Sequence, residues 1–352
     1  MRHLSVPSQD TQRVLLQLKA ESALPEGARV RSDPDDSGRR LIPFIDNSSQ
    51  TIAAQYPVID IDVDPPPART YRDHLEDLLP AGVIASTEWP TRHEFVGDLI
   101  LIKLDENQRQ HGPTIGQALL LQHSRTRAVF EDRGVRGVFR VRELDLLAVR
   151  EGQRVTTRTR IVESGHHLWT DPSTVYYSSR LSHEREGTLE CAKNLRGELG
   201  RPLAICDPYA GVGPSLLPLI SEPDLIAELF AGDLNPAAVE FLRENISHPS
   251  ATIECTDARR LKERSEMCNK YDLLLVNIPH DTLEHLPELI PLVRPNGIVR
   301  GWAVIDDSDF DNAQKRLYNI LGSEAILEIR RSYSASANLC RFEARKAVQP
   351  NC

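Results

Sequence analysis

The sequence predicts an α/β protein, in which a doubly wound, Rossmann-like domain follows two smaller α+β domains. Three observations lead to this fold class. Strands and helices alternate through the last half of the 352-residue chain. Runs such as Leu203–Asp207 and Tyr271–Val276 are almost wholly apolar, as expected of parallel strands covered on both faces. A glycine-containing turn follows the first of these runs and leads into a helix.

The first predicted domain, residues 1–64, is a small α+β module. A strand is expected at His3–Val6, a helix at about Gln9–Leu24 and another strand at Val58–Val63. Asp64 and the three prolines that follow it interrupt this pattern and indicate a linker.

The second predicted domain, residues 70–172, is α+β or mostly β. A helix is expected at Tyr71–Leu79, and a hairpin turn at Ser164-Gly165. The strands expected here are Phe95–Leu104, Ala128–Phe130, Gly137–Leu144, Arg154–Glu163 and His167–Trp169.

The third predicted domain, residues 173–352, begins with an amphipathic helix at Ser182–Leu199 that Gly200 ends. Asn235 is expected to cap a helix whose first residue is Pro236. The strands expected here are Leu203–Asp207, Glu228–Leu234, Thr252–Asp257, Tyr271–Val276 and Ile298–Ile305, with a closing strand pair. Further helices are expected near 282–293 and at Asp309–Leu321.

Composition excludes several classes of protein. No run of eighteen apolar residues occurs, and the N-terminus turns polar too early for a signal peptide, so a cytoplasmic protein with no membrane contact is expected. No two of the six cysteines are spaced as CxxC, which argues against a metal site or a disulfide framework. The net charge of −9 argues weakly against nucleic acid. Residues 121–160, however, hold ten arginines against five acids, which leaves an RNA-binding face and a simple compositional bias equally open.

The turn after the first strand, Asp207-Pro-Tyr209-Ala-Gly211-Val212-Gly213-Pro214, indicates a ligand site. A dinucleotide fingerprint would place a third glycine where this chain has Leu216, so a ligand without phosphate fits better. Asp233 ends the second strand, where an acid can hold both ribose hydroxyls, and Asp257-Ala258 end the third, where they can reach an adenine amine. The alternative is that these acids only cap turns and helices.

Asn277-Ile-Pro279-His280 ends the fourth strand. A side-chain amide followed by a rigid proline can hold the edge of a planar substrate. Methyltransferases that act on exocyclic amines carry Asn-Pro-Pro-aromatic here, so Ile278 and His280 make such a target less expected. His280 itself is interpreted as a supporting or surface residue and not as a catalyst.

At these motifs the chain resembles the archaeal and eukaryal type of tRNA (guanine-37-N1)-methyltransferase over nearly its whole length. The resemblance rests on Phe95–Asp98, Phe139–Leu144, Val175–Arg185, Asp207–Pro214, Asp233–Pro236 and Asn277–His280. Ser179 stands where that family usually has proline. The resemblance implies a class I methyltransferase fold, S-adenosyl-L-methionine as cofactor, tRNA as partner, and a monomer that needs no metal.

The resemblance also implies roles for individual residues. N1 of guanine carries a proton and is a poor nucleophile until a base removes it, and Glu184 takes the position of the family's base. Arg140 takes the position that stabilises charge on O6, and Asn277 would orient the base. Arg142 would share a strand face with Arg140 and could hold phosphate. The residues that the resemblance places at the cofactor are Tyr177, Arg180, Asp207, Tyr209, Gly211, Val212, Gly213, Asp233, Leu234, Asn235, Asp257, Ala258, Asn277 and Pro279.

Without the resemblance, Glu184 would be interpreted as an ordinary first-turn helix acid. We expect its neighbours Arg185 and Arg180 to keep it ionised. Two other functions remain open. One is transfer of the aminocarboxypropyl group of the same cofactor in wybutosine synthesis, whose enzymes have a Ser-Gly-Asn-like sequence where this chain has Ser179-Arg180-Leu181. The other is RNA binding without catalysis, against which the presence of Glu184, Arg140 and Asn277 argues.

Overall fold

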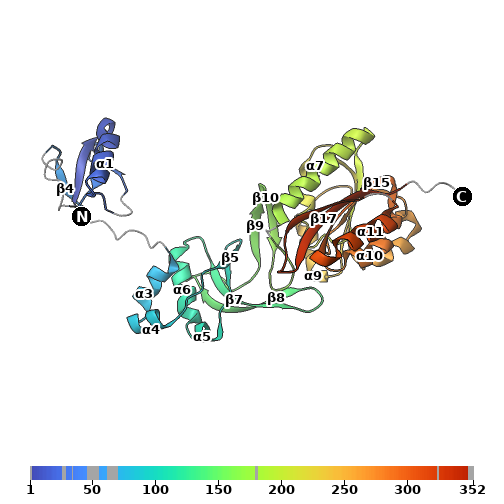
Figure 1. Ribbon diagram of the computed structural model, residues 1–352, viewed down its shortest axis with the longest axis horizontal. Helices are drawn as coiled ribbons and strands as arrows, with labels where there is room; N and C mark the ends of the chain where they lie inside the picture. Colours follow the sequence, from blue (N-terminus) through green and yellow to red (C-terminus); the bar gives the residue numbers. More distant parts are fainter. Residues whose placement is uncertain are drawn as a thin grey trace. The chain divides into compact units, whose positions relative to one another are not determined.

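A computed structural model describes residues 2–25, 29–33, 35–45, 55–61, 70–178, 181–322 and 325–347. The chain divides into two compact units, residues 1–73 and 74–352 (Figure 1). The division falls inside helix α3 (Tyr71–Leu78), a few residues beyond the proline-rich segment. In the described part of the chain, no helix is long and apolar enough to cross a bilayer. The division into three domains remains a prediction.

In its described residues, the first unit has a four-stranded sheet and helix α1. The strands follow the order β2-β3-β1-β4, and β1 pairs antiparallel with both neighbours. The elements are β1 (Arg2–Pro7), η1 (Ser8–Asp10), α1 (Thr11–Ala20), β2 (Arg31–Ser32), β3 (Arg39–Pro43) and β4 (Val58–Asp60). Leu4, Val14, Leu18 and Ile42 form its core. The expected helix ends earlier than predicted because Ser22 adopts a positive φ of 53°.

The second unit begins with a four-stranded sheet in the order β5-β6-β7-β8, backed by helix α6. Its elements are α3, α4 (Ala81–Ser86), β5 (His93–Val96), β6 (Leu99–Ile102), α5 (Glu106–Arg109), α6 (Gly112–Gln122), β7 (Ala128–Arg136) and β8 (Val141–Val149). The hairpin of β9 (Thr159–Glu163) and β10 (His166–Thr170) follows. Helices α4, α5 and α6 were not predicted from the sequence.

Three strand predictions in this region were wrong. The strand expected at Arg154–Glu163 begins only at Thr159. The single strand expected at residues 95–104 is a hairpin, because Gly97 turns the chain at a φ of 59°. A Cβ at Gly97 would lie 2.2 Å from Thr159 Oγ1, so the turn packs directly on β9. The strand expected from Gly137 begins only at Val141, and Arg140 lies in the preceding turn at a φ of 51°. Arg140 and Arg142 therefore do not share a strand face.

The rest of the second unit is a seven-stranded sheet in the order β13-β12-β11-β14-β15-β17-β16. The first five strands are parallel, and β17 runs antiparallel to both of its neighbours. The strands are β11 (Leu203–Asp207), β12 (Ile226–Asp233), β13 (Ala251–Cys255), β14 (Tyr271–Val276), β15 (Val293–Asp306), β16 (Ile326–Ser332) and β17 (Ala337–Arg345). The predicted fold class, a Rossmann-like domain preceded by smaller sheets, is confirmed.

Helices cover both faces of this sheet (Figure 1). One apolar cluster joins Leu203 and Ile205 to α7, α8 and α9, and the other joins Ala204 and Cys206 to η3, α10 and α11. The helices are α7 (Ser182–Leu199), α8 (Leu216–Ser221), α9 (Pro236–Asn245), η3 (Ala258–Glu263), η4 (Ser265–Met267), α10 (Thr282–Leu289), η5 (Ile290–Leu292), η6 (Asp307–Asp309) and α11 (Phe310–Leu321). Successive side chains of β11 point alternately into these two clusters. Both faces of the strand are therefore buried, which explains why its sequence is an apolar run.

Candidate cofactor and active site

Three carboxylates lie at one edge of the large sheet. Asp207 ends β11, Asp233 ends β12, and Asp257 follows β13. These three strands are parallel neighbours, so their carboxyl ends meet at the same edge. The predicted grouping of acids is therefore present in the fold.

The turn after β11 is tied to the second acid. The backbone N–H of Gly211 donates to Asp233 Oδ2 at 3.0 Å, and that of Tyr209 donates to Asp207 Oδ1 at 3.3 Å. Gly211 has a φ of 56° and open space on its Cβ side, where the nearest atom is the carbonyl oxygen of Tyr176 at 4.0 Å. A ligand can approach the backbone there closely.

Gly213, unlike Gly211, packs closely against a neighbouring helix. Its φ is 90°, and a Cβ on it would lie 2.8 Å from Leu242 of α9. Val212 is buried, and its carbonyl accepts a hydrogen bond from Asn245 at 2.9 Å. These two residues shape the turn through packing and leave ligand contact to Gly211.

Burial dominates the charge state of the first two acids. It raises the pKa of Asp207 to about 7, and the neighbouring Asp233 adds to the rise. Burial also raises the pKa of Asp233, although backbone N–H groups of Asn235 and Gly211 oppose it. A ligand that donates hydrogen bonds here would favour the ionised forms.

The two residues after Asp233 differ in whether their side chains are free to contact a ligand. Leu234 is exposed. The Asn235 side chain accepts from Ala237 N at 3.0 Å and donates to Thr174 O at 2.9 Å, which makes it the predicted helix cap and an anchor for the preceding loop. The amide of Asn235 is thus used within the protein, whereas Asp233 keeps lone pairs for ribose hydroxyls.

Asp257 is also engaged. It caps η3 by accepting from Arg259 N, and Arg259 Nη2 lies 2.6 Å from its Oδ2. The Arg259 hydrogen bond holds the pKa of Asp257 below its ordinary value. Ala258 is buried beside it. An adenine amine at this carboxylate would have to share it with Arg259.

Tyr209, in the turn after β11, contacts helix α10. Its hydroxyl is 2.7 Å from His285 Nδ1 on α10, a partner that the sequence did not reveal. An open polar cavity of about 530 Å³ adjoins Asp257 and His285 and is bounded by Arg260, Glu284 and other charged side chains. Of the three acids only Asp257 lines this cavity, and the turn at Gly211 does not, so we place the candidate site at the strand ends.

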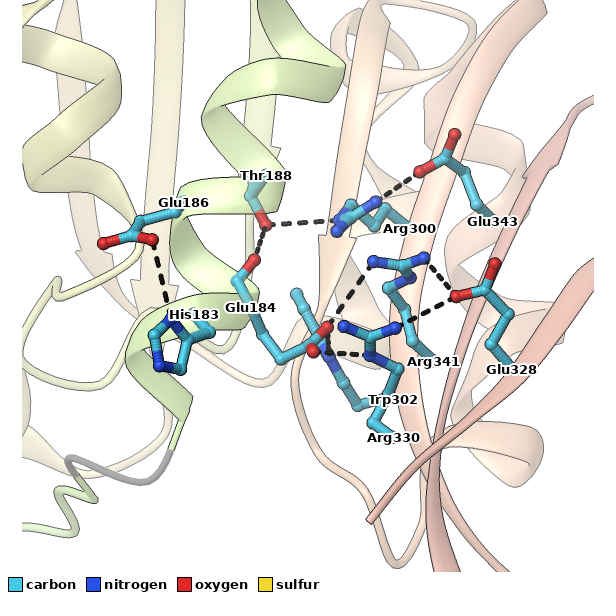
Figure 2. A network of polar contacts seen from close by, with 10 residues as sticks. All are labelled: His183, Glu184, Glu186, Thr188, Arg300, Trp302, Glu328, Arg330, Arg341 and Glu343. Atoms are coloured by element: carbon cyan, nitrogen blue, oxygen red, sulfur yellow. Dashed lines mark hydrogen bonds and ion pairs between the residues drawn. The ribbon is translucent and has the colours of Figure 1, made fainter.

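Glu184 lies in the first turn of α7, and its carboxylate faces the last strands of the sheet (Figure 2). Its side chain is buried. Trp302 Nε1 of β15 donates to Oε2 at 3.2 Å, and Arg330 Nε of β16 donates to Oε1 at 2.6 Å. Arg341 Nη1 of β17 lies 3.7 Å from Oε2. All three partners were missed from the sequence.

The charge state of Glu184 follows from two opposed effects. Burial alone would raise its pKa, but hydrogen bonds from Arg330 and Trp302 and the charges of Arg330 and Arg341 outweigh burial. The pKa is therefore below the ordinary value, and Glu184 is ionised at neutral pH.

Of the two neighbours expected to keep Glu184 ionised, Arg185 was the wrong choice, and Arg180 cannot be compared. Arg185 is turned away from Glu184: its Nη1 lies 2.6 Å from Glu163 Oε1, and its Nη2 donates to Ser178 O at 2.9 Å. Arg180 and Ser179 lie outside the described residues. Tyr177, expected at the cofactor, donates its hydroxyl to Glu163 at 2.6 Å beneath the Arg185 guanidinium.

Asn277 directly follows β14. Val276 pairs with Gly301 of β15, so Asn277 and Trp302 occupy the next positions of adjacent strands. The carbonyl of Pro279 accepts from Val304 N at 2.7 Å, which fixes the loop after β14 against β15. Glu184 therefore contacts Trp302, and Asn277 follows β14 at the position next to Trp302 in the sheet.

Arg140 lies in the β7–β8 turn. The pKa of His280 is lowered by burial and then by the positive charge of Arg140. His280 Nε2 also lies 2.9 Å from the hydroxyl of Tyr333, consistent with a supporting role. The charge of Arg140 thus acts on His280, three residues beyond Asn277.

Most of the arginine-rich stretch serves the fold. Arg142 is held by Glu94 at 2.9 Å and Asp132 at 3.0 Å, so its guanidinium is occupied, contrary to the expected phosphate contact. Arg158 pairs with Glu244 at 2.5 Å and covers the Trp169 ring. Ion pairs or carbonyl contacts also occupy Arg127, Arg133, Arg136 and Arg150. Among the described contacts, the side chains of Arg125, Arg140, Arg154 and Arg160 have neither an ion-pair partner nor a carbonyl contact, and Arg160 lies over the Trp169 ring.

The described residues contain no cluster of side chains that could hold a metal ion. The TRM5/TYW2 methyltransferase domain model matches residues 159–326, and the TYW2 N-terminal domain model matches residues 71–154. Residues 159–326, just under half of the chain, thus belong to the TRM5/TYW2 methyltransferase domain family. The recognition made from the motifs is confirmed.

Individual members of the TRM5/TYW2 family resemble this chain over different lengths. The tRNA (guanine(37)-N(1))-methyltransferase Trm5b of Pyrococcus abyssi is 28% identical over 62% of this chain and 62% of its own, so less than two thirds of that relative is spanned. The structure of aTrm5 in complex with tRNALeu has a TM-score of 0.71 at 21% identity, covering 98% and 99% of the two chains. P. horikoshii TYW2 in complex with MeSAdo has a TM-score of 0.60 at 18% identity, covering 78% and 97%. The two structures establish a shared fold.

Proposed function

We propose that this protein transfers the methyl group of S-adenosyl-L-methionine to N1 of guanosine 37 of tRNA. The observation that carries the proposal is the ionised Glu184 carboxylate, which is hydrogen-bonded to Trp302 and Arg330 where Asn277 follows β14 at the carboxyl edge of the sheet. A buried carboxylate at this edge can accept the proton of a planar base whose other edge is held by an amide. Curated relatives with this activity support the assignment.

The residues at the strand ends fit the cofactor. Gly211 leaves its backbone open to a ligand, and Asp233 offers a carboxylate for the two ribose hydroxyls. Asp207 is buried with a raised pKa, so a donor from the ligand would stabilise its charge. Leu234 is exposed beside Asp233, where it can pack on a planar ring. The bound cofactor would supply an electrophilic methyl group.

The proton step rests on Glu184. N1–H of guanine must be deprotonated for N1 to act as a nucleophile, and Glu184 is the proposed acceptor. A carboxylate whose pKa is lowered is a weak base, so the negative charge that develops toward O6 needs its own stabilisation. Arg140, whose charge reaches the loop at His280, is proposed for that role. Asn277 would fix the orientation of the base.

We propose tRNA as the partner and a monomer as the acting form. Besides Arg140, the arginines of the 121–160 stretch that have no ion pair or carbonyl contact among the described residues are Arg125, Arg154 and Arg160, and we propose these for phosphate contact. The N-terminal unit, with its own core around Leu4 and Leu18, is proposed as a separate tRNA-binding module.

The match of residues 71–154 to the TYW2 N-terminal domain supports a second candidate, aminocarboxypropyl transfer from the same cofactor. The experiment that separates them incubates unmodified tRNA with the protein and cofactor, followed by mass spectrometry of the nucleosides. We expect 1-methylguanosine. An aminocarboxypropyl nucleoside would favour the second candidate, and cofactor left intact with all tRNAs would refute both.

A further inference from the structure

We propose that Arg330, together with Arg341 and Trp302, forms a clamp that positions the Glu184 carboxylate for proton transfer and holds it in its charged form. This proposal rests on the proposed role of Glu184 as the base. The name clamp refers below to these three residues, which come from β16, β17 and β15. Arg330 and Arg341 lie in the C-terminal hairpin, beyond residue 326, where the family model's match ends.

The clamp fixes both oxygens of the carboxylate. Arg330 Nε donates to Oε1 at 2.6 Å, while Trp302 Nε1 donates to Oε2 at 3.2 Å and Arg341 approaches the same oxygen at 3.7 Å (Figure 2). Donors on two sides prevent rotation of the carboxylate about its terminal bond. Each oxygen of a carboxylate accepts about two hydrogen bonds, so capacity remains for a substrate N–H.

Glu328 contacts both arginines of the clamp. Glu328 Oε2 lies 3.2 Å from Arg330 Nη1 and 2.5 Å from Arg341 Nη2, so one carboxylate ties both guanidinium groups together. Arg330 uses Nε for Glu184 and Nη1 for Glu328, which is a fork geometry that lysine cannot reproduce. The clamp is therefore preorganised without substrate.

The surroundings of Glu184 contain other charges. They are His183 and Glu186 on α7, Arg300 on β15, Glu328 and Arg330 on β16, and Arg341 and Glu343 on β17 (Figure 2). His183 Nδ1 and Glu186 Oε2 lie 3.7 Å apart, and both side chains point away from the clamp (Figure 2). Arg300 pairs with Glu343 and bonds Thr188. Arg330 is therefore the guanidinium in closest contact with Glu184.

Removing Arg330 should change the titration of Glu184 in a definite direction. Burial raises the pKa of this carboxyl, and the Arg330 hydrogen bond is the first of the effects that lower it. Without Arg330 burial weighs more heavily, so the pKa rises and the ionised fraction at a given acidic pH falls. The acid limb of the rate profile should then move to higher pH.

Arg330 is a positioning residue, because its side chain contacts Glu184 and no substrate atom is assigned to it. The test compares the full-length protein with Arg330→Gln and Arg330→Lys. Arg345→Gln is the matched control, since Arg345 lies on β17 and pairs with the exposed Glu198. The carboxyl carbon of Glu184 is followed by carbon-13 NMR through a pH titration and assigned with Glu184→Gln.

We expect the Glu184 titration to move to higher pH in Arg330→Gln, to stay near the parent in Arg330→Lys, and to be unchanged in Arg345→Gln. Single-turnover methyl transfer should show the same shift of its acid limb in Arg330→Gln. Its plateau rate should fall by about ten- to a hundredfold, since misplacement by about 1 Å can cost that much. Arg330→Lys should regain the acid limb but only part of the plateau rate.

The NMR titration needs no turnover, so it tests the clamp even if the proposed activity is wrong. An unchanged Glu184 titration in Arg330→Gln, or an equal shift in Arg345→Gln, would overturn the clamp. A shifted titration with an unshifted rate profile would overturn its part in catalysis and leave only a structural contact. If Arg330→Gln does not fold, Arg330→Lys tests the clamp instead. Its plateau rate must then fall below that of the parent.

Discussion

Glu184→Gln removes the proton acceptor while it preserves the shape of the side chain. The glutamine oxygen can still accept a hydrogen bond from Trp302 or Arg330, and Arg330 is partly exposed, so it can recover water contacts. General-base catalysis contributes about a hundred- to ten-thousandfold in rate. At about 1.4 kcal/mol for each tenfold, the variant should lose about 3 to 5 kcal/mol of transition-state stabilisation.

The assay is single-turnover methyl transfer to tRNA at neutral pH, with cofactor and tRNA affinities measured separately. Both affinities should stay within about twofold of the parent, because the proton moves only in the transition state. Glu186→Gln is the matched control: the residue lies in the same turn of α7 and is exposed, with His183 as its partner. A Glu184→Gln protein that turns over at the parent rate would refute the base assignment. Glu184 would then be an ordinary helix acid.

Arg140→Ala should lower the single-turnover rate by about a hundredfold or more while calorimetry shows unchanged cofactor binding, because its charge is needed only as O6 becomes negative. Asp233→Asn should weaken cofactor binding by about ten- to a hundredfold in calorimetry, the value of one or two hydrogen bonds to a charged group. Asp207→Asn should reduce the pH dependence of the free energy of unfolding. Burial raises the pKa of Asp207 from 3.8 to about 7, so between these values the folded form binds more protons than the unfolded form. The free energy of unfolding of the parent therefore falls as pH rises through that range. Urea unfolding of the cofactor-free variant should show a smaller fall, and a fall equal to that of the parent would count against the burial argument. Arg154→Ala should weaken tRNA binding at low salt without changing which nucleotide is modified, and salt-independent tRNA binding by the parent would remove its basis.

Local signals in the sequence located the elements that carry the site. The bounds of α7, β11 and β14 agree with the prediction, because a capped amphipathic helix and two apolar runs are strong local patterns. Asn235 caps α9 as expected. Helix α6 was missed because it starts at Gly112-Pro113 and contains Gly116, residues that usually mark turns. In the fold, Gly116 allows α6 to approach Ala148 of β8 closely.

Contacts across long stretches of chain could not be predicted in this way. Glu184 meets Trp302 and Arg330 after more than a hundred residues, and only the strand order of the sheet brings them together. The positive neighbours of Glu184 were instead sought among adjacent residues, and Arg185 proved to bind Glu163. The motifs therefore located Glu184, the proposed base, but not the groups that set its charge.

The most direct test of the proposed function compares two tRNA transcripts that differ only at nucleotide 37, one with guanosine and one with adenosine. Each is incubated with the protein and with cofactor carrying a labelled methyl group. We expect label in the guanosine-37 transcript, recovered as 1-methylguanosine, and none in the other. Equal labelling of both transcripts, or label recovered in a different nucleoside, would contradict the proposal that this site deprotonates and methylates N1 of guanosine 37.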